Sequence, residues 1–187
     1  MKLPVSRRKS SGSKLPTPRE ALALLKEAGC SLEVVAHSVT VTRIALRLAR
    51  KLKSKGFNVD LNLIEVGALL HDLGRSKTHN VKHGYLGGEI ARSMGLPEPL
   101  INIIERHVGG GITAEEAEKL GMPKRDFVPR SLEEKIITYA DKLVARDKSV
   151  NFEATLKEFS GKLGPNHPAL ERLKKLRREI LEKMGDL

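Results

Sequence analysis

Helix-start and helix-stop signals follow one another along almost the whole chain. The sequence contains three capping-box patterns, in which a Ser or Thr is followed three residues later by a Glu, so that each side chain can bond to the other residue's backbone. Single N-cap residues and glycines suited to helix ends lie between them. The helix starts are Thr17 (followed by Pro18), Ser31, Asp60, Thr113 and Ser131, and the helix ends are Gly29, Gly56, Gly74 and Gly95. No segment shows the alternation of a strand or a hairpin turn. The sequence therefore predicts an all-α fold of about seven to nine helices.

Three parts of different character follow one another in the 187 residues. Residues 1–16 indicate a flexible basic arm, loosest at the Ser-Ser-Gly-Ser run. Residues 17–150 are predicted to form one domain, whose core is built mainly from Leu, Ile, Val and Ala because aromatic residues make up only 3% of the chain. Residues 151–187 are predicted to form a C-terminal helical extension packed on that domain.

A net charge of +11 indicates an anionic partner such as a nucleotide, an RNA or an acidic protein. The basic clusters, in the arm and at residues 174–178, are equally typical of a loose tail and a solvated helix face. No apolar run is long enough to cross a membrane, the N-terminus lacks the apolar region of a signal peptide, and the single Cys30 excludes an intrachain disulfide. We expect a soluble cytoplasmic protein with no membrane partner, and the oligomeric state stays open.

Four histidines and a distal aspartate lie on faces that are otherwise apolar, and another aspartate adjoins one of the histidines. The apolar neighbours at helical spacing are Val41, Ile44 and Leu48 for His37; Ile64 and Ala68 for His71; Leu86 and Ile90 for His83; Leu100, Ile103 and Ile104 for His107; and Ile137 and Val144 for Asp141. One inward histidine is ordinary, but four of them with Asp72 and Asp141 beside them need a common explanation. Buried charges are usually paired or bound to metal, so a metal site is predicted.

The chemistry of these donors favours a divalent transition metal. Imidazole and carboxylate together suit Mn, Fe, Co or Ni, with Mg or Zn as alternatives. Six candidate ligands exceed the needs of one tetrahedral zinc, which favours two ions. Asp72 is the natural bridging ligand if the helix ends beside it, as Gly74 suggests. Two ions about 3.5–4 Å apart would hold a bridging hydroxide and clamp a phosphoryl group, so that water and no protein residue attacks.

The order of these residues resembles a known family. His37, then His71-Asp72-Leu73-Gly74, then Asp141-Lys142 is similar to the HD superfamily of metal-dependent phosphohydrolases, whose pattern is a histidine, a His-Asp doublet and a distal aspartate. The doublet resembles the subgroup in which Ile-Gly follows it. The resemblance covers about residues 31–144 and implies an HD-domain helical bundle with phosphohydrolase activity.

Two further histidines make the resemblance more specific. His83-Gly84, His107 and Ala140-Asp141-Lys142 resemble the arrangement in bacterial HD enzymes that hydrolyse diadenosine tetraphosphate. This resemblance implies that one ion is held by His37, His71, Asp72 and Asp141, and the other by Asp72, His83 and His107. Two departures are visible: the Gly-Tyr-Pro triplet of the cyclic dinucleotide phosphodiesterases is absent, and Val108 replaces a second late histidine of some two-metal members, which leaves the second ion fewer ligands.

Several of these residues have alternative interpretations. An alternative for His83 and His107 is that they are core histidines whose hydrogen bonds are satisfied within the protein. His79 is predicted to be solvated, and His167 is predicted to begin a helix. Arg75 and Lys142 are predicted to contact substrate phosphate, although Arg75 equally fits a surface cation at a helix C-terminus. Lys82 and Arg106 are weaker candidates of that kind, predicted to be solvated, and the Gly109-Gly110-Gly111 run forms either a rim of the site or a plain helix stop.

The leading hypothesis is a metal-dependent phosphohydrolase that cleaves a phosphoester or phosphoanhydride of a nucleotide or related small molecule, with Asp72, Arg75 and Lys142 as catalytic residues. One alternative is a nucleotide- or RNA-binding HD module with little catalysis. Another is a phosphodiesterase acting on RNA ends or cyclic phosphates, which would join the same metal chemistry to the basic surface.

Overall fold

The computed structural model describes residues 14–186, so the basic arm predicted at residues 1–16 lies outside the described residues except for its last three. The all-α prediction is confirmed: the described residues form nine α-helices, one 3₁₀ helix and a pair of two-residue strands. In chain order these are α1 (Pro18–Ala28), α2 (Leu32–Ser54), α3 (Leu61–Leu70), η1 (Leu73–Ser76), α4 (His83–Ser93), α5 (Glu98–Arg106), α6 (Ala114–Lys119), α7 (Leu132–Asp141), β1 (Val144–Ala145), β2 (Lys148–Ser149), α8 (Phe152–Leu163) and α9 (Pro168–Met184).

The predicted helix starts are confirmed by their capping bonds. At each one the side-chain oxygen accepts a hydrogen bond from a backbone N–H two or three residues on, which satisfies a donor that the first turn leaves without a partner. The predicted N-caps are Thr17, Ser31, Asp60, Thr113 and Ser131, and Asn151 caps α8 in the same way. The reciprocal bond of a capping box forms at Thr17 and Thr113, but at Ser131 the Glu134 carboxylate accepts from the Arg130 N–H instead. His167 caps α9 in the same way through its ring, so it begins a helix as the sequence indicated.

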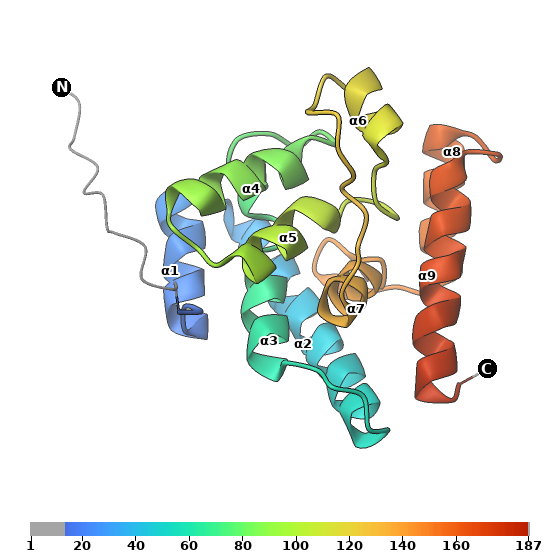
Figure 1. Ribbon diagram of the computed structural model, residues 1–187, viewed down its shortest axis with the longest axis horizontal. Coiled ribbons are helices and arrows are strands. Elements are labelled where there is room, and N and C mark those ends of the chain that lie inside the picture. The colour runs from blue at the N-terminus through green and yellow to red at the C-terminus, as the bar shows by residue number, and fades with distance from the viewer. Residues whose placement is uncertain (1–13, 187) are drawn as a thin grey trace.

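The long helix α2 and its neighbours α3 and α7 form the centre of the molecule (Figure 1). α1 lies at one side of this centre in Figure 1, and α8 and α9 lie at the opposite side. Apolar side chains of α2, α3 and α7 share one hydrophobic cluster with those of α9, from which Leu173, Leu176, Ile180 and Met184 take part. The C-terminal helices thus pack on the central helices; the division of the chain at residue 150 stays a prediction.

A second hydrophobic cluster joins α1, α3, α4 and α5. It holds Leu70 and Leu73 on either side of the His-Asp doublet, together with Leu100 and Ile104 on α5, all of them buried. The two clusters thus hold the segments that carry the candidate ligands. No helix among residues 14–186 is both long enough and apolar enough to cross a membrane.

The end of α3 differs from the expectation. The sequence predicts that this helix runs through Asp72 and stops at Gly74, whereas α3 ends at Leu70 and Gly74 lies inside η1. Gly74 is needed for close packing, because a Cβ built there would overlap the His83 carbonyl and lie 2.6 Å from the Gly87 nitrogen. The glycine therefore lets η1 approach α4, which brings the doublet close to His83.

The short hairpin of β1 and β2 was not predicted. Val144 pairs with Ser149 and Ala145 with Lys148 in antiparallel register. The turn between them contains Arg146 with φ of 58°, a left-handed conformation that glycine or asparagine usually supplies. Because the turn carries neither residue, propensity gave no sign of it.

Candidate metal centre

The structure brings the six predicted ligands together, each at or near the end of a helix. His37 projects from α2, His71 follows the last residue of α3, Asp72 precedes η1, His83 begins α4, His107 follows α5, and Asp141 ends α7. His71, Asp72, His83 and His107 are buried, and Asp141 and His37 are largely buried. Residues more than a hundred positions apart therefore meet in one cluster.

Every imidazole in the cluster is oriented by a backbone carbonyl that lies at hydrogen-bond distance from its Nδ1 atom. The distances are 2.6 Å from His37 to the Arg146 oxygen, 2.7 Å from His71 to Ala68, 2.8 Å from His83 to Asn80, and 2.8 Å from His107 to Ile104. Because a carbonyl only accepts, each Nδ1 carries the proton and donates it. Each neutral ring is therefore held in the tautomer that leaves the Nε2 lone pair free.

The four Nε2 atoms point inward at one another and at the carboxylates. The Nε2 atoms of His83 and His107 lie only 3.0 Å apart, although both rings already use their proton at Nδ1. His71 Nε2 has no hydrogen-bond partner at all, and neither does Asp72 Oδ1. Two lone pairs facing each other repel unless a proton or a cation lies between them. Buried acceptors without donors fit a cation-binding cluster and are costly for any other role.

The two oxygens of Asp72 face different histidines. Oδ1 lies 3.2 Å from His83 Nε2 and 3.4 Å from His107 Nε2, while Oδ2 lies 3.8 Å from His37 Nε2 and 3.7 Å from His71 Nε2. Two sets of three residues are close enough to hold a metal ion, and they share Asp72: His37, His71 and Asp72, and Asp72, His83 and His107.

Asp141 extends the first of these sets. Its Oδ1 lies 3.0 Å from His37 Nε2 and 3.6 Å from His71 Nε2. Because this oxygen faces the same two imidazoles as Asp72 Oδ2, the first set has one donor more than the second.

Electrostatics favour the protonation states that metal binding requires at Asp72, Asp141 and His107. At His71, burial lowers the pKa, but Asp72 and Asp141 outweigh burial and raise it. Burial opposes ionisation of Asp72, but His71, His107 and His83 hold its pKa well below the usual range. Burial likewise opposes ionisation of Asp141, while Lys142 and the nearby imidazoles hold its pKa well below the usual range. Burial lowers the pKa of His107 to about 4, so this ring is neutral at neutral pH. Anionic carboxylates and neutral imidazoles are the forms that coordinate cations.

Two cations touch the carboxylates from the solvent side. Arg75 Nε donates to Asp72 Oδ2 at 2.7 Å, and Lys142 Nζ donates to Asp141 Oδ2. Arg75 is thus held in the cluster and is not the plain surface cation that was the alternative. Lys142 is 7% exposed and also lies 5.4 Å from the centre of the Phe159 ring.

A cleft of about 1170 Å³ opens above the cluster. His37, Asp72 and Asp141 line it, together with Arg75 and Lys142. Its walls come from the start of α2, from the β1–β2 hairpin and from α8. The cleft is large enough for a nucleotide, and the two carboxylates that line it, Asp72 and Asp141, each contact a cation.

Some predicted residues lie outside the cluster. His79 is exposed, as expected, although it lines the cleft, and Lys82 is half-buried. Arg106 is not solvated, which corrects the prediction: its guanidinium binds both carboxylate oxygens of the buried Glu134 at 3.1 Å. The sequence pattern of α5 cannot indicate this partner, because Glu134 lies on a different helix, α7.

The glycine run after α5 is not among the residues that line the cleft. Gly109 and Gly111 have positive φ, and a Cβ on Gly110 would lie 3.0 Å from the backbone of α9 at Ala169 and Leu173. The run therefore ends α5 and allows α9 to pack closely, which favours the helix-stop interpretation over a rim of the site.

Sequence reasoning missed two contributors to the site. Arg146 acts through its backbone, since its carbonyl orients His37, and a single sequence carries no signal for a carbonyl. Phe159 of α8 lines the cleft and packs beside Lys142, yet it follows no motif. Only the scarcity of aromatic residues in the chain singles it out.

Comparisons with known proteins agree with this geometry. The family model described as HD domain matches residues 34–146. An uncharacterised protein of Methanocaldococcus jannaschii is 47% identical over 161 residues, which are 86% of this chain and 95% of that protein. The tRNA (cytidine(56)-2'-O)-methyltransferase of Picrophilus torridus is 38% identical over 166 residues, which are 89% of this chain but only 47% of that enzyme, so the chain spans about half of its length.

A solved structure shows the same fold. The HD domain of the L. monocytogenes phosphodiesterase PgpH, in complex with cyclic-di-AMP, superposes with a TM-score of 0.52 and 16% identity, covering 89% of this chain and 95% of that one. At this identity the likeness concerns the fold alone. The family match spans more than half of the chain, and all six clustered residues lie between its first and last positions. The chain belongs to the HD domain family.

Proposed function

We propose that this chain is a metal-dependent phosphohydrolase that cleaves a phosphoester or phosphoanhydride of a nucleotide or a related substrate. The observation that carries the proposal is the set of four imidazoles, each with its Nδ1 proton donated to a backbone carbonyl. The Nε2 atoms of all four face Asp72, and those of His37 and His71 also face Asp141. Such an arrangement is complete only with cations at its centre, and it lies where a large cleft reaches the interior.

The ligand assignment follows from which oxygen faces which ring. His37, His71, Asp72 and Asp141 would hold one divalent ion, and Asp72, His83 and His107 the other, with Asp72 shared through its two oxygens. Nitrogen and oxygen donors together favour Mn, Fe, Co or Ni, with Mg or Zn as alternatives. Ions held there would polarise a phosphoryl oxygen and lower the pKa of water.

The protein's own side chains would orient the substrate. Arg75 and Lys142 are fixed against the carboxylates and line the cleft, so their remaining N–H donors would meet the phosphate oxygens of a bound substrate. Charge that develops on those oxygens in the transition state is then stabilised without reorganisation. The burial of His71, His83 and His107 keeps bulk water from the inner end of the cluster.

The substrate class is the finer part of the proposal. The His83-Gly84, His107 and Ala140-Asp141-Lys142 segments resemble those of diadenosine tetraphosphate hydrolases, so dinucleoside polyphosphates are the first substrates to test. The cyclic-di-AMP bound to the PgpH domain supports a nucleotide in the cleft of this fold.

A phosphodiesterase acting on RNA ends or cyclic phosphates is the second candidate. A relative supports it, because this chain matches 47% of a protein that is named as a tRNA methyltransferase. The same metal chemistry would serve both candidates, and the surface outside the cleft would distinguish them.

The test is hydrolysis by protein that is stripped of metal and then reloaded with Mn, Fe, Co, Ni, Mg or Zn. The substrates are mononucleotides, dinucleoside polyphosphates, cyclic nucleotides and short RNAs. Asp72→Ala is the test variant, and Asp186→Ala, which removes an exposed carboxylate paired with Lys51, is the matched control. We expect metal-dependent turnover that Asp72→Ala abolishes and Asp186→Ala retains, with unchanged helical circular dichroism in both.

Turnover that survives Asp72→Ala would contradict the proposal. Metal binding without turnover of any substrate would favour the binding module that the sequence left open.

A further inference from the structure

The outer face of α2 carries a row of three arginines. Arg43, Arg47 and Arg50 are spaced by four and three residues, so they project from one side of the helix, and all three are exposed. Of the lysines and arginines of α2, only Lys51 has a carboxylate within 4.0 Å in the part of the chain that the structure describes, namely Asp186. The arginine row therefore keeps its charge available to a partner.

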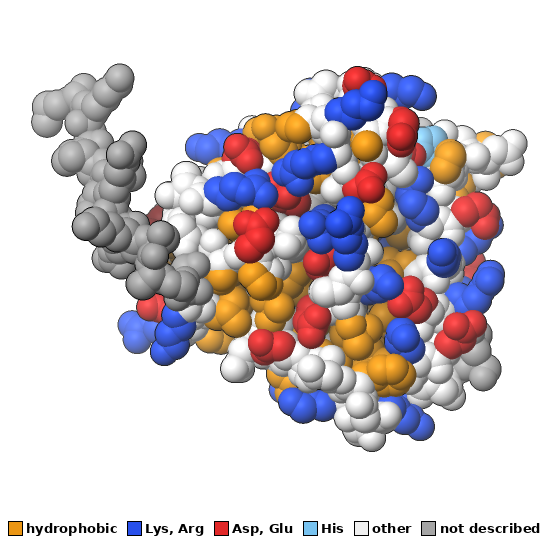
Figure 2. All heavy atoms as spheres, viewed as in Figure 1, with side chains coloured by type: hydrophobic (Ala, Val, Ile, Leu, Met, Phe, Trp, Pro, Cys, Tyr) orange, Lys and Arg blue, Asp and Glu red, His pale blue; other side chains and the backbone are white. Residues whose placement is uncertain are grey.

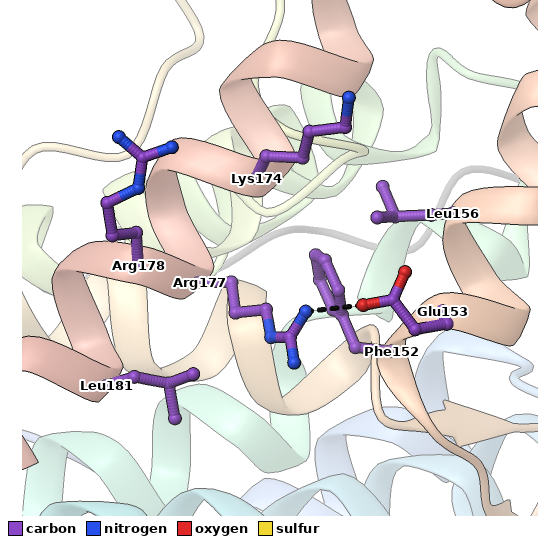
Figure 3. Close-up of a pocket in the computed structure, with 7 residues that line it drawn as sticks. All are labelled: Phe152, Glu153, Leu156, Lys174, Arg177, Arg178 and Leu181. Carbon is purple, nitrogen blue, oxygen red and sulfur yellow. Dashed lines mark hydrogen bonds and ion pairs between the residues drawn. The ribbon is translucent and has the colours of Figure 1, made fainter. Parts of the chain in front are cut away.

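Several surface cations elsewhere in the described residues are paired with carboxylates. On the face shown in Figure 2, basic and acidic side chains lie intermingled. The pocket of about 400 Å³ between α8 and α9 has three cations. Arg177 bonds to Glu153 across it (Figure 3), and Lys174 bonds to Glu171, whereas Arg178 has no carboxylate within 4.0 Å among the described residues. Surface pairs of this kind cancel much of the local field. The three arginines of the row differ from such pairs, because none of them has a carboxylate within 4.0 Å among the described residues.

The row is connected to the cleft by a chain of direct contacts. Arg43 donates from its guanidinium to Thr40 Oγ1 at 3.2 Å, and Thr40 Oγ1 donates to the Asp147 carbonyl at 3.2 Å. Asp147 lies in the turn of the β1–β2 hairpin beside Arg146, and both residues line the cleft. The hairpin turn, with the exposed Arg146 and Asp147, therefore connects the cleft to Arg43 and to the row on α2.

We propose that the row formed by Arg43, Arg47 and Arg50 binds the backbone of a single-stranded polynucleotide, which passes over the hairpin toward the cleft. The row spans seven residues, or about 10 Å along the helix axis. A stacked strand has one phosphate per about 3.4 Å, so the row matches about three successive phosphates. Guanidinium groups suit this partner because they bind phosphate oxygens with two parallel hydrogen bonds.

This binding surface goes beyond the proposed hydrolysis, which needs only a phosphate in the cleft. A polynucleotide is favoured over a second copy of the chain because three unpaired arginines would have to be desolvated in a protein interface, and such charges are costly without carboxylate partners. The strand, by contrast, supplies one negative charge per arginine and leaves the row partly solvated.

The experiment measures binding of a fluorescein-labelled single strand of twelve nucleotides, as RNA and as DNA, by anisotropy over a range of salt concentrations. The test variant is Arg43→Gln/Arg47→Gln/Arg50→Gln, in which glutamine keeps a high helix propensity. The matched control is Arg19→Gln/Lys26→Gln/Lys119→Gln, which removes the same charge from exposed residues of α1 and α6. Both are checked by thermal unfolding and by light scattering.

We expect the row variant to bind at least about tenfold more weakly at low salt and its log–log salt slope to fall by about 2, since each lost contact on a single strand accounts for about 0.7. The control should keep most of the wild-type slope. An equal loss for RNA and DNA would identify phosphate as the recognised group, and a loss for RNA alone would add the ribose hydroxyl to it. The proposal is overturned if the row variant binds as the wild type does, if the control loses as much, or if the row variant changes the oligomeric state while its slope stays the same.

Discussion

Two clusters of buried acid and base lie on neighbouring parts of this molecule, and only one of them is complete by itself. Asp72 Oδ1 and the Nε2 atom of the adjacent His71 have no hydrogen-bond partner. Around Glu105, a buried residue of α5, both carboxylate oxygens accept from guanidinium groups: Arg125 donates at 2.8 and 2.9 Å and Arg92 at 2.6 Å.

The contrast separates a cluster whose charges the protein itself pairs from one that it leaves unsatisfied. Glu105 connects α5 to Arg92 of α4 and to Arg125 in the segment after α6, and each charge there has a partner of opposite sign. In the histidine cluster the donors are used up on backbone carbonyls, which leaves acceptors facing acceptors. A buried arrangement that no protein group satisfies is the one that a ligand has to complete.

The largest effect is expected where the complete cluster is broken. Glu105→Ala leaves two guanidinium groups without their shared carboxylate, and we expect it to lower the free energy of unfolding by about 3 kcal/mol. Urea unfolding at neutral pH measures this. The metal content of Glu105→Ala should match that of the wild type. A loss of metal would contradict the view that the two clusters are independent.

A slightly smaller effect is expected where the incomplete cluster is filled. A metal at a hundred times its dissociation constant should raise the free energy of unfolding by about 2.7 kcal/mol, because it binds only the folded state. Thermal unfolding with and without Mn measures the shift. Asp72→Ala should remove it and Glu105→Gln should not. An equal shift in all three proteins would place the metal elsewhere.

A helical glycine against Glu105 provides a third test. A Cβ on Gly88 of α4 would overlap the Glu105 side chain, whereas a Cβ on Gly161 of α8 would meet nothing within 4 Å. We expect Gly88→Ala to destabilise the fold by about 1–2 kcal/mol, and Gly161→Ala to stabilise it by about 0.5 kcal/mol through helix propensity. Parallel urea titrations compare the two variants, and equal effects would mean that Glu105 is less tightly held than the contacts indicate.

The smallest effect is expected in the stability of the fold at acidic pH. Burial opposes ionisation of Glu105, but Arg125 and Arg92 outweigh it and lower the pKa of Glu105 below 4.5. The folded state therefore binds its proton less readily than the unfolded state, so this contribution to stability is full above pH 4.5 and is lost as the pH falls through the folded pKa. Below pH 4.5 the stability of the wild type should fall more steeply than that of Glu105→Gln. Unfolding titrations at decreasing pH measure both slopes, which would be the same if the ion pairs contributed nothing.

Much of the fold was predictable because its signals are local. Caps such as Thr17 and Asp60 act within one helical turn, and apolar spacing marks the buried face of each helix. The clustering of His37 with Asp141 was predictable for the same reason, since an inward polar residue must find a partner across the core. The left-handed turn at Arg146 was not, because its conformation depends on contacts with α2 that no local pattern encodes.

The cleft and the salt bridges were beyond local reasoning as well. Arg106 looked like a solvated cation because its partner Glu134 lies on another helix, and Gly74 looked like a helix stop because its close approach to α4 depends on tertiary packing. The cleft walls join α2 and α8, which are distant in the chain and share no motif. Pairing across elements, unlike capping, is set by the whole fold.

Anomalous diffraction from crystals soaked in Mn is the most direct test of the histidine cluster as a metal centre. The account predicts two peaks that share Asp72, one among His37, His71 and Asp141 and the other between His83 and His107. No peak at the cluster, with Mn bound elsewhere or not at all, would contradict it.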